Sequence, residues 1–340
     1  MEKIAVVILN WNGRNWLEQF LPNVIKYSGN ARIVVADNGS TDDSVAYVQK
    51  KFPTVEITTN VKNGGFAKGY NDALKQVNAE FYLLLNSDIE VTPNWLQPLY
   101  AAMDDPSVAG CQPKVLSYHN RDEFEHAGAS GGFIDKNYFP FCRGRLFDNV
   151  EKDNGQYNGT TEIFWATGAC LLIRSELFHS VGGFDEDFFA HMEEIDLCWR
   201  LKKMNHRFLA IPESRVFHVG GGTLPYKTPQ KVYLNFRNNL IMIGKNHEGW
   251  LFPKIMYRLT LDGIAAMRFL AGGEFKNFRA VFNAHMWHHR NIGKILKKRK
   301  AVKTLSTSFN KKGLYGGSIL WAYFFKRIRV FEDLNQRLFK

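Results

Sequence analysis

Short apolar runs followed by polar turns divide the first hundred residues into alternating strands and helices. Apolar and β-branched runs predict strands at 4–9, 33–36, 55–58 and 81–85, and helically spaced apolar residues predict a helix after each of the first three. Strands that alternate with helices form parallel sheets with right-handed crossovers. Each predicted strand runs toward Asn, Asp or Gly, so we expect polar groups to gather along one edge of the sheet.

The strand at 81–85 consists of five apolar residues and leads directly into Asn86-Ser87-Asp88. Such a short run between polar flanks is typical of a buried parallel strand. Ligands of open α/β sheets bind at the carboxyl ends of strands, which makes Asp88 a candidate site residue. The alternative is that Asn86 and Asp88 only shape a turn or cap a helix that begins near Pro93.

The rest of the body is predicted to contain further strands and helices around a loop-rich insertion at 117–159, where the periodicity fades. The predicted elements are, in order, a helix at 93–104, strands at 108–115 and 164–173, helices at 175–181 and from about 193, short strands at 208–212 and 216–219, and helices from 235 onward.

The C-terminal part differs from the body in charge. Residues 251–340 contain 19 Lys and Arg against 4 Asp and Glu, a net charge of +15, whereas residues 1–250 contain 25 against 29, a net charge of −4. Residues 251–270 are apolar but interrupted by charges, which predicts an amphipathic helix and not a membrane span. The basic tail points to an anionic surface, either phospholipid or nucleic acid. The alternative is that these helices pack on the body and leave a solvated basic face.

Overall composition indicates a globular protein: 45% of the 340 residues are hydrophobic, enough for one large domain or two modest ones. Its four cysteines lie about thirty residues apart without a metal-like pairing, which fits buried thiols in a reducing compartment. The N-terminal apolar run is too short for a signal peptide and is interpreted as the first strand.

Three side chains are candidates for a binding site, each for its own chemical reason. Asp37 ends the second strand, where carboxylates commonly bind a nucleoside. Asp88 could hold Mg²⁺ or Mn²⁺, because such a cation needs few protein ligands when a diphosphate supplies the others. His218 precedes Gly220, Gly221 and Gly222 and could be a second metal ligand, although a lone histidine is more often structural.

The segment Glu193-Glu194-Ile195-Asp196 carries too many carboxylates for a core position. A solvated helix N-terminus would explain them through the helix dipole. The functional interpretation makes one of them a general base, because neighbouring carboxylates and an apolar pocket raise a pKa toward the operating pH.

Five motifs in this order resemble the family 2 inverting glycosyltransferases, most closely the bacterial rhamnosyltransferase-like members. The resemblance covers about residues 4–245, and its motifs begin at Val7, Val35, Asn63, Asn86 and Met192. It implies a GT-A fold, an α/β architecture with a Rossmann-like, mostly parallel sheet, flanking helices and a C-terminal helical, basic extension. The expected divisions are a nucleotide-sugar-binding half at 1–115, an acceptor-binding and catalytic half at 116–245, and the extension at 246–340.

The resemblance also assigns residues by position. Asp88 and His218 would bind the metal, and Glu194 would be the catalytic base. The family often has Asp at the position of Glu194, so Asp196 stays open as an alternative base. The expected nucleotide-binding residues are Asn10, Asn12, Asp37, Asn38, Gly65, Asn71, Asn86 and Ser87.

The expected activity is transfer of a sugar, with rhamnose as one candidate, from a nucleotide-diphosphate sugar to a hydroxyl of a glycan or polyprenyl-diphosphate-linked acceptor in cell-surface polysaccharide synthesis. Mg²⁺ or Mn²⁺ is the expected cofactor. The basic tail suggests a cytoplasmic enzyme that is peripheral at the inner face of the cell membrane, and no nucleic acid is expected as partner.

Two other functions stay open. A sugar nucleotidyltransferase should carry a Gly-rich, Arg- and Lys-containing loop after the first strand, which residues 10–14 lack. A non-catalytic membrane or nucleic-acid adaptor is compatible with the aromatic and basic tail, but it would not need Asp37, Asp88 and Glu194 together.

Overall fold

A computed structural model describes residues 3–125, 128–220 and 228–340. Its first part confirms the predicted alternation of strands and helices. The elements are β1 (Ile4–Asn10), α1 (Arg14–Tyr27), β2 (Arg32–Asp37), α2 (Ser44–Lys51), β3 (Glu56–Thr59), α3 (Gly65–Leu74), β4 (Phe81–Asn86), β5 (Ile89–Val91), α4 (Leu96–Ala101), η1 (Ala102–Asp104) and β6 (Val108–Ser117).

The middle of the chain adds short strands and the helix that carries the acidic segment. Its elements are β7 (Gly132–Asp135), β8 (Pro140–Cys142), β9 (Arg145–Leu146), β10 (Asn149–Val150), β11 (Thr161–Ile163), β12 (Cys170–Arg174), α5 (Ser175–Ser180), η2 (Glu186–Phe188), α6 (Glu193–Lys202) and β13 (Arg207–His218).

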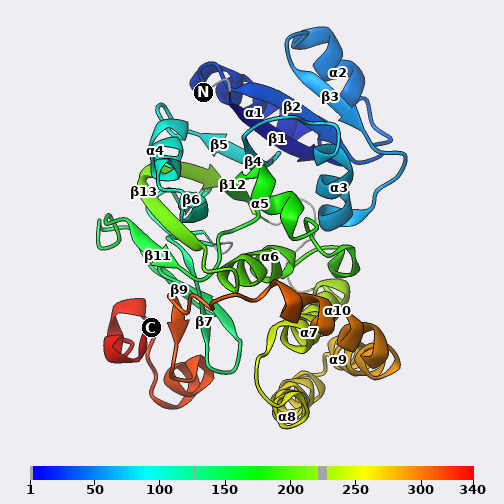
Figure 1. The fold of residues 1–340 in the computed structure, drawn as a ribbon, viewed down its shortest axis with the longest axis vertical. Helices are drawn as coiled ribbons and strands as arrows, with labels where there is room; N and C mark the ends of the chain where they lie inside the picture. Colours follow the sequence, from blue (N-terminus) through cyan, green and yellow to red (C-terminus); the bar gives the residue numbers. More distant parts are fainter. Residues whose placement is uncertain (1–2, 126–127, 221–227) are drawn as a thin grey trace.

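A large mixed sheet forms the centre of the molecule, with the strand order β11-β13-β6-β12-β4-β1-β2-β3 (Figure 1). β3, β2, β1 and β4 run parallel, as predicted, and β12 then pairs antiparallel with both β4 and β6. Because β1 and β2 lie in register, their last residues Asn10 and Asp37 end side by side. The predicted polar edge therefore exists.

Helices cover both faces of this sheet, as the continuous burial of its central strands requires. On β1, Val7 packs into the apolar cluster with α3, α5 and α6, whereas Val6 and Ile8 pack into the cluster with α1 and α4. The fold prediction of a Rossmann-like sheet with flanking helices is confirmed.

Two local predictions were wrong. The segments 208–212 and 216–219 are not separate strands but parts of β13, which continues through an irregularity between Ile211 and Arg215. The insertion at 117–159 is not simply a loop, because β7 to β10 form a small second sheet there. Its fifth strand, β14 (Leu314–Tyr315), comes from the far end of the chain.

The C-terminal extension is helical and packs on the body. Helix α7 (Pro229–Asn246) leads into it. Its own elements are α8 (Leu251–Ala271), α9 (Phe275–Arg290), α10 (Ile292–Leu305), β14, the short π-helix η3 (Trp321–Phe325) and the short 3₁₀-helices η4 (Phe331–Asp333) and η5 (Gln336–Leu338). Figure 1 shows α7 to α10 gathered below the sheet, with α8 at the lower end. Over residues 3–125, 128–220 and 228–340, no helix is both long and apolar enough to cross a membrane.

Candidate active site

Asn10 and Asp37 form a buried polar pair where β1 and β2 end. The Asn10 amide donates to Asp37 Oδ1 over 3.2 Å and to Ser44 Oγ over 3.0 Å. Asp37 Oδ2 accepts from the backbone amide of Ser40 over 3.0 Å, so Asn10 and Ser40 hold this carboxylate in place from two sides. Asn12 has a φ of 50° and accepts from the Thr41 amide over 2.7 Å. These bonds join the loop after β1 to the loop after β2, and together the two loops form one rigid polar edge.

The next group of predicted nucleotide-binding residues connects this edge to the acidic segment. Asn38 donates to the Gly65 carbonyl over 3.0 Å. Gly65 has a φ of +80°, and a Cβ on it would lie 2.5 Å from Phe189. Asn71 donates to the Phe184 carbonyl over 2.8 Å and accepts from the Phe184 amide over 2.9 Å, so its side chain holds the chain before α6.

Asp88 and His218, which are 130 positions apart, lie in contact because β5 pairs with the end of β13. His218 Nε2 is 3.2 Å from Asp88 Oδ1, and His218 Nδ1 is 3.2 Å from Glu125 Oε2. Asn86 also reaches Nε2, at 3.4 Å. Of the glycines behind His218, Gly220 has a positive φ, whereas Gly221 and Gly222 lie outside the described residues.

This buried group is suited to a cation. Burial opposes protonation of His218, but the carboxylates of Glu125 and Asp88 outweigh it and raise the histidine pKa to about 10. Two carboxylates around one imidazolium leave a surplus of negative charge. A cation that displaced a proton from His218 would meet carboxylate oxygen and imidazole nitrogen, a donor set that Mn²⁺ accepts. In the described part of the chain, no three such side chains surround a common metal position, so further ligands would have to come from a diphosphate or water.

Glu193 and Glu194 begin α6, and each has a buried Oε2 atom without a hydrogen-bond partner among the described residues. Burial raises the pKa of Glu194 to about 7. Burial and the neighbouring Glu194 raise the pKa of Glu193 well above its ordinary value. With a pKa of about 7, Glu194 can exchange a proton near neutral pH, which is what a general base requires.

The strand end with Asp88 and the head of α6 are linked through Gly168 and Ala169. The backbone amide of Asn86 donates to the Ala169 carbonyl over 2.9 Å. A Cβ on Gly168 would lie 3.7 Å from the Glu194 Cβ. Glu194 therefore lies beside the carboxyl end of β4, on the same edge as Asp88.

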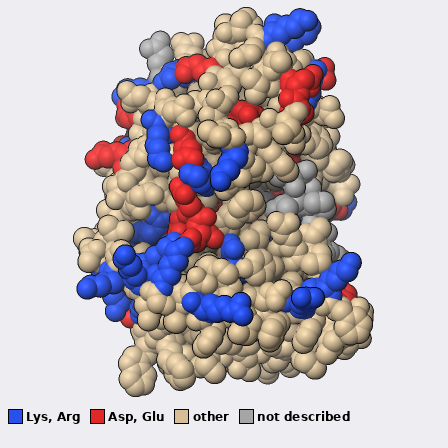
Figure 2. Space-filling view, turned by 90° about the vertical axis from the view of Figure 1, so that its right-hand side faces the viewer, with Lys and Arg blue, Asp and Glu red and all other residues tan. Residues whose placement is uncertain are grey.

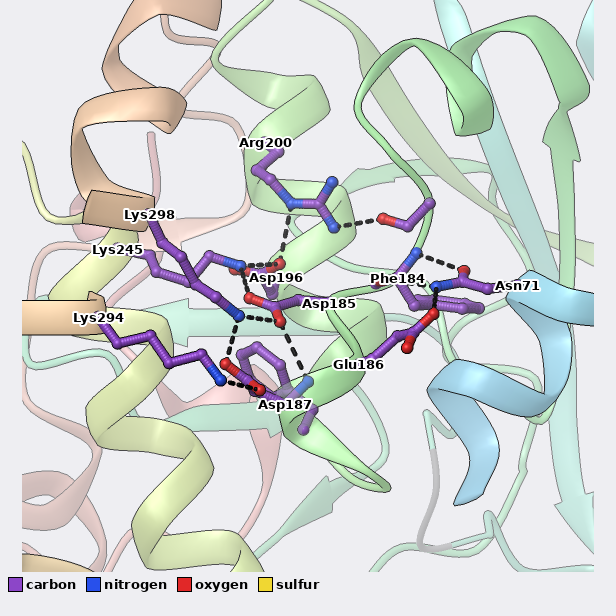
Figure 3. Close-up of polar contacts among 12 residues, drawn as sticks. Asn71, Phe184, Asp185, Glu186, Asp187, Asp196, Arg200, Lys245, Lys294 and Lys298 are labelled. Carbon is purple, nitrogen blue, oxygen red and sulfur yellow. Dashed lines mark hydrogen bonds and ion pairs between the residues drawn. The ribbon is translucent and has the colours of Figure 1, made fainter. Parts of the chain in front are cut away.

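Asp196 has a different environment from Glu194. Its carboxylate accepts from Arg200 over 2.9 Å and from Lys245 over 2.9 Å (Figure 3). It also accepts from Asn246 over 2.8 Å. Burial would raise its pKa, but the charges of Lys245 and Arg200 outweigh burial and lower it. A fully buried carboxylate held by two cations and an amide is poorly placed to take a proton from a substrate.

Cations from α7 and α10 also bind the acidic segment before α6. Asp185 is paired with Lys245 of α7 and Lys298 of α10, and Asp187 is paired with Lys294 and Lys298 (Figure 3). Burial opposes ionisation of Asp185, but the two lysines lower its pKa. Part of the basic charge in the tail is therefore used inside the molecule, as the packing alternative for these helices requires.

The loop between these ion pairs and Glu194 has a strained backbone. Phe189 has φ 63° and ψ −62°, and the Ala190 amide donates to the Phe188 carbonyl over 2.7 Å, which makes a γ-turn of the strained kind. His191 and Met192 also have positive φ.

Asn238 of α7 holds this loop in place. Its side-chain amide lies 2.9, 2.8 and 2.7 Å from the carbonyls of Phe188, Ala190 and His191. The buried amide thereby fixes the backbone that delivers Glu194.

Sequence reasoning missed Glu125 and Asn238. Glu125 lies in the aperiodic insertion, where no pattern marks a partner for a histidine 93 positions later. Asn238 lies in the polar triplet Arg237-Asn238-Asn239 of a predicted helix. Buried polar residues in a helix need hydrogen-bond partners, so the triplet was the available signal.

Comparison with known proteins agrees with the fold and with the order of the motifs. Residues 5–182, more than half of the chain, match the family described as Glycosyl transferase family 2. The N-acetylglucosaminyl-diphospho-decaprenol L-rhamnosyltransferase of Mycobacterium tuberculosis is 23% identical over 281 residues, covering 78% of this chain and 91% of the relative. The dTDP-rhamnosyl transferase RfbF of Shigella flexneri is 23% identical, covering 64% and 72%.

Solved structures of glycosyltransferases have the same fold. GalNAc-T7 with UDP, GalNAc and Mn²⁺ matches with a TM-score of 0.55 and 16% identity over 72% of this chain, which spans about half (48%) of that protein. The mannosyltransferase PcManGT from Pyrobaculum calidifontis, in complex with GDP-Man and Mn²⁺, matches with a TM-score of 0.50 and 14% identity, covering 89% of this chain and 85% of that one. The chain is a GT-A glycosyltransferase that belongs to glycosyl transferase family 2.

Proposed function

We propose that this enzyme transfers a sugar, with rhamnose as the leading candidate, from a nucleotide-diphosphate sugar to a hydroxyl of a lipid-linked glycan, with inversion at the anomeric carbon. The observation that carries the proposal is the position of Glu194, a carboxylate with a raised pKa and an unpartnered oxygen, on the sheet edge that also holds Asp37 and Asp88. The names of the M. tuberculosis and S. flexneri relatives support rhamnose as the sugar.

The donor would bind along the edge formed by β1, β2 and β4. Asp37 is fixed by Asn10 and Ser40 and would accept hydrogen bonds from the nucleoside. Asn38, Gly65 and Asn71 would act mainly by holding loops, because their polar groups already bind other parts of the chain. Asn12, Asn86 and Ser87 complete the proposed nucleotide edge.

Asp88 and His218 would hold Mg²⁺ or Mn²⁺, whose charge would stabilise the diphosphate leaving group. Support comes from the surplus negative charge of this buried group and from the Mn²⁺ named with GalNAc-T7 and PcManGT. Glu125 would keep His218 oriented from its other nitrogen, as carboxylates do for metal-binding histidines.

Glu194 would take the proton from the acceptor hydroxyl as that oxygen attacks the anomeric carbon. One displacement from the face opposite the leaving group gives inversion. We assign the base to Glu194 and not to Asp196, because the cations around Asp196 stabilise its charged form and reduce its basicity.

Within this proposal, residues 1–115 form the donor half, residues 116–245 the acceptor half, and residues 246–340 a helical extension. The acceptor of the M. tuberculosis relative is named as a diphospho-decaprenol, and a polyprenyl chain is anchored in a membrane. We therefore place this enzyme at the inner face of the cell membrane as a peripheral protein, with the extension nearest the lipid.

The function is tested by incubating the purified chain with dTDP-rhamnose, a polyprenyl-diphosphate-linked N-acetylglucosamine and Mn²⁺. We expect a rhamnosylated product whose anomeric configuration, read by nuclear magnetic resonance, is opposite to that of the donor. Glu194→Gln should lower the rate by about 10²–10⁴-fold. A Glu194→Gln protein that works at the parent rate would remove this residue as the base.

A thermal-shift screen identifies the donor if dTDP-rhamnose is wrong, because the tightest ligand raises the melting temperature most. Release of pyrophosphate from a nucleoside triphosphate and a sugar 1-phosphate would support a nucleotidyltransferase instead. An adaptor would neither transfer nor hydrolyse any nucleotide sugar.

A further inference from the structure

Helix α8 has two charged residues inside, Arg258 and Asp262, and several apolar residues outside. Arg258 and Asp262 are buried and form a 2.7 Å ion pair one turn apart, and Asp262 is only 1% exposed. The guanidinium of Arg258 lies 3.9 Å from the centre of the Phe139 ring, on the body of the enzyme. A helix on a water-exposed surface normally has the reverse arrangement.

The outward side of α8 is mostly apolar, with the exposed Thr260 as a polar residue between Met256 and Ile264. Phe252 is 77% exposed, Ile264 63% and Met267 58%, and Met256 is also exposed. These four residues, the apolar face of α8, follow one another at spacings of 4, 8 and 3 positions, which places them along one side of a helix. The exposed positions from Phe252 to Met267 carry no Lys, Arg, Asp or Glu, and the exposed Arg268 follows directly after them.

A second exposed apolar group lies beside this helix. In the π-helix η3, Trp321 stacks on Phe325 with ring centres 4.4 Å apart, and both side chains are exposed. The guanidinium of Arg268, near the end of α8, lies 5.9 Å from the centre of the Phe324 ring, which joins the two groups. Two elements from distant parts of the chain therefore extend one apolar surface.

Basic side chains border this surface. Lys326 and Arg327 follow η3 directly, and Lys276 and Arg279 lie exposed on α9, which packs against α8. In Figure 2, the lower end of the molecule is almost free of charged side chains, and Lys and Arg gather in a band just above it. An apolar base with a cationic edge is complementary to hydrocarbon below and anionic headgroups at the rim.

We propose that the apolar face of α8 and the aromatic π-helix η3 dock this enzyme on an anionic lipid bilayer, with α8 lying in the plane of the interface. The helix would insert Phe252, Met256, Ile264 and Met267 to the depth of the headgroup boundary while its buried ion pair stays in protein. The inference deepens the proposed function, since it names how the extension meets the membrane, but its evidence is independent of the donor site.

Co-sedimentation of the full chain with vesicles tests the proposal. Ile264→Asp is compared with Val61→Asp, which makes the same chemical change at a fully exposed β-branched residue in the loop after β3. We expect the parent to bind phosphatidylglycerol-containing vesicles more tightly than pure phosphatidylcholine vesicles. Ile264→Asp should weaken binding at least ~10-fold, because an interfacial helix loses affinity when a charge enters its apolar face. Val61→Asp should bind within about twofold of the parent.

Three results would overturn the proposal: no binding of the parent to anionic vesicles, equal binding of Ile264→Asp and the parent, or a parent dimer in solution that Ile264→Asp dissociates. The last result would assign the face to a second copy of the chain. Both variants should keep the parent melting temperature and the nucleotide-sugar thermal shift. Loss of vesicle binding with a retained thermal shift separates this proposal from the proposed donor chemistry.

Discussion

Replacing Asn238 with Ala removes the amide that holds the strained loop before Glu194. The side chain has two N–H groups for three carbonyls, and the Phe188 carbonyl keeps a second donor in Arg237 at 3.0 Å. The main loss therefore falls on the carbonyls of Ala190 and His191. An unsatisfied buried polar group costs about 1–3 kcal/mol, so for two carbonyls we expect a loss of about 2–6 kcal/mol in the free energy of unfolding.

The loop conformation should change as well as the stability. Three residues with positive φ, namely Phe189, His191 and Met192, store roughly 1–3 kcal/mol each. This strain is of the same size as the hydrogen bonding that opposes it, so the loop should relax once Asn238 is lost. A shift of about 1 Å at Glu194 can reduce the rate by ~10²-fold.

The neighbouring residue provides a matched control. Asn239 is also buried on α7, but its amide donates to the Tyr138 carbonyl over 3.1 Å, away from the loop. Asn239→Ala should cost about 1–3 kcal/mol of stability and leave kcat near the parent value.

Steady-state kinetics and chemical denaturation are measured for both variants at a temperature where each is folded. The expected result for Asn238→Ala is a lower kcat with an unchanged KM for the donor. Equal kcat values for the two variants would refute the argument that the amide positions the base.

Four further predictions follow from the same structure. Because the pKa of Glu194 is raised to about 7, kcat/KM should fall as the pH drops below 7. The stability that its neutral form contributes is complete below about pH 4.5 and should be lost as the pH rises through 7. A profile of kcat/KM that is flat from pH 6 to 8 would contradict this assignment. Lys245→Met should cost about 3–5 kcal/mol in the free energy of unfolding because it leaves buried carboxylates uncompensated, whereas Lys294→Met, at an exposed lysine, should cost about 1 kcal/mol or less in the same denaturation assay. Asp88→Asn should abolish the extra thermal shift that Mn²⁺ gives with a nucleotide diphosphate, and retention of that shift would exclude Asp88 as a ligand. Gly65→Ala should reduce transfer and lower the melting temperature, since the new methyl group would collide with Phe189, and parent-like values for both would show that the loop adjusts freely.

The donor half of the fold could be predicted from the sequence because its signals are local. The strands β1 to β4 correspond to short apolar or β-branched runs, and each of the first three is followed by a helix of regular spacing, so order and direction follow from chain connectivity. Asn10, Asp37 and Asp88 could be placed on one edge for the same reason. Predictions failed where pairing depends on distant segments, as in the small sheet that β14 completes from 180 positions away.

The site itself was only partly visible from the sequence. The motifs indicated Glu194 and left Asp196 open, because both occupy the same acidic segment and differ only in what surrounds them. The distinction depends on Lys245, which lies 49 positions from Asp196 and on another helix. The contact between Asp88 and His218 likewise depends on the three-residue strand β5, which is too short to be recognised by periodicity.

The lysines that neutralise Asp185 and Asp187 have a consequence for engineering. A chimera that joins residues 1–245 to the tail of another glycosyltransferase would separate these carboxylates from Lys294 and Lys298. The foreign tail would then have to supply cations at the same two places, or the recombined enzyme would lose the support of its catalytic segment. Exchange of acceptor preference between such enzymes should therefore succeed more often when the crossover lies before residue 185. Asp185 and Asp187 are then transferred together with the lysines that bind them.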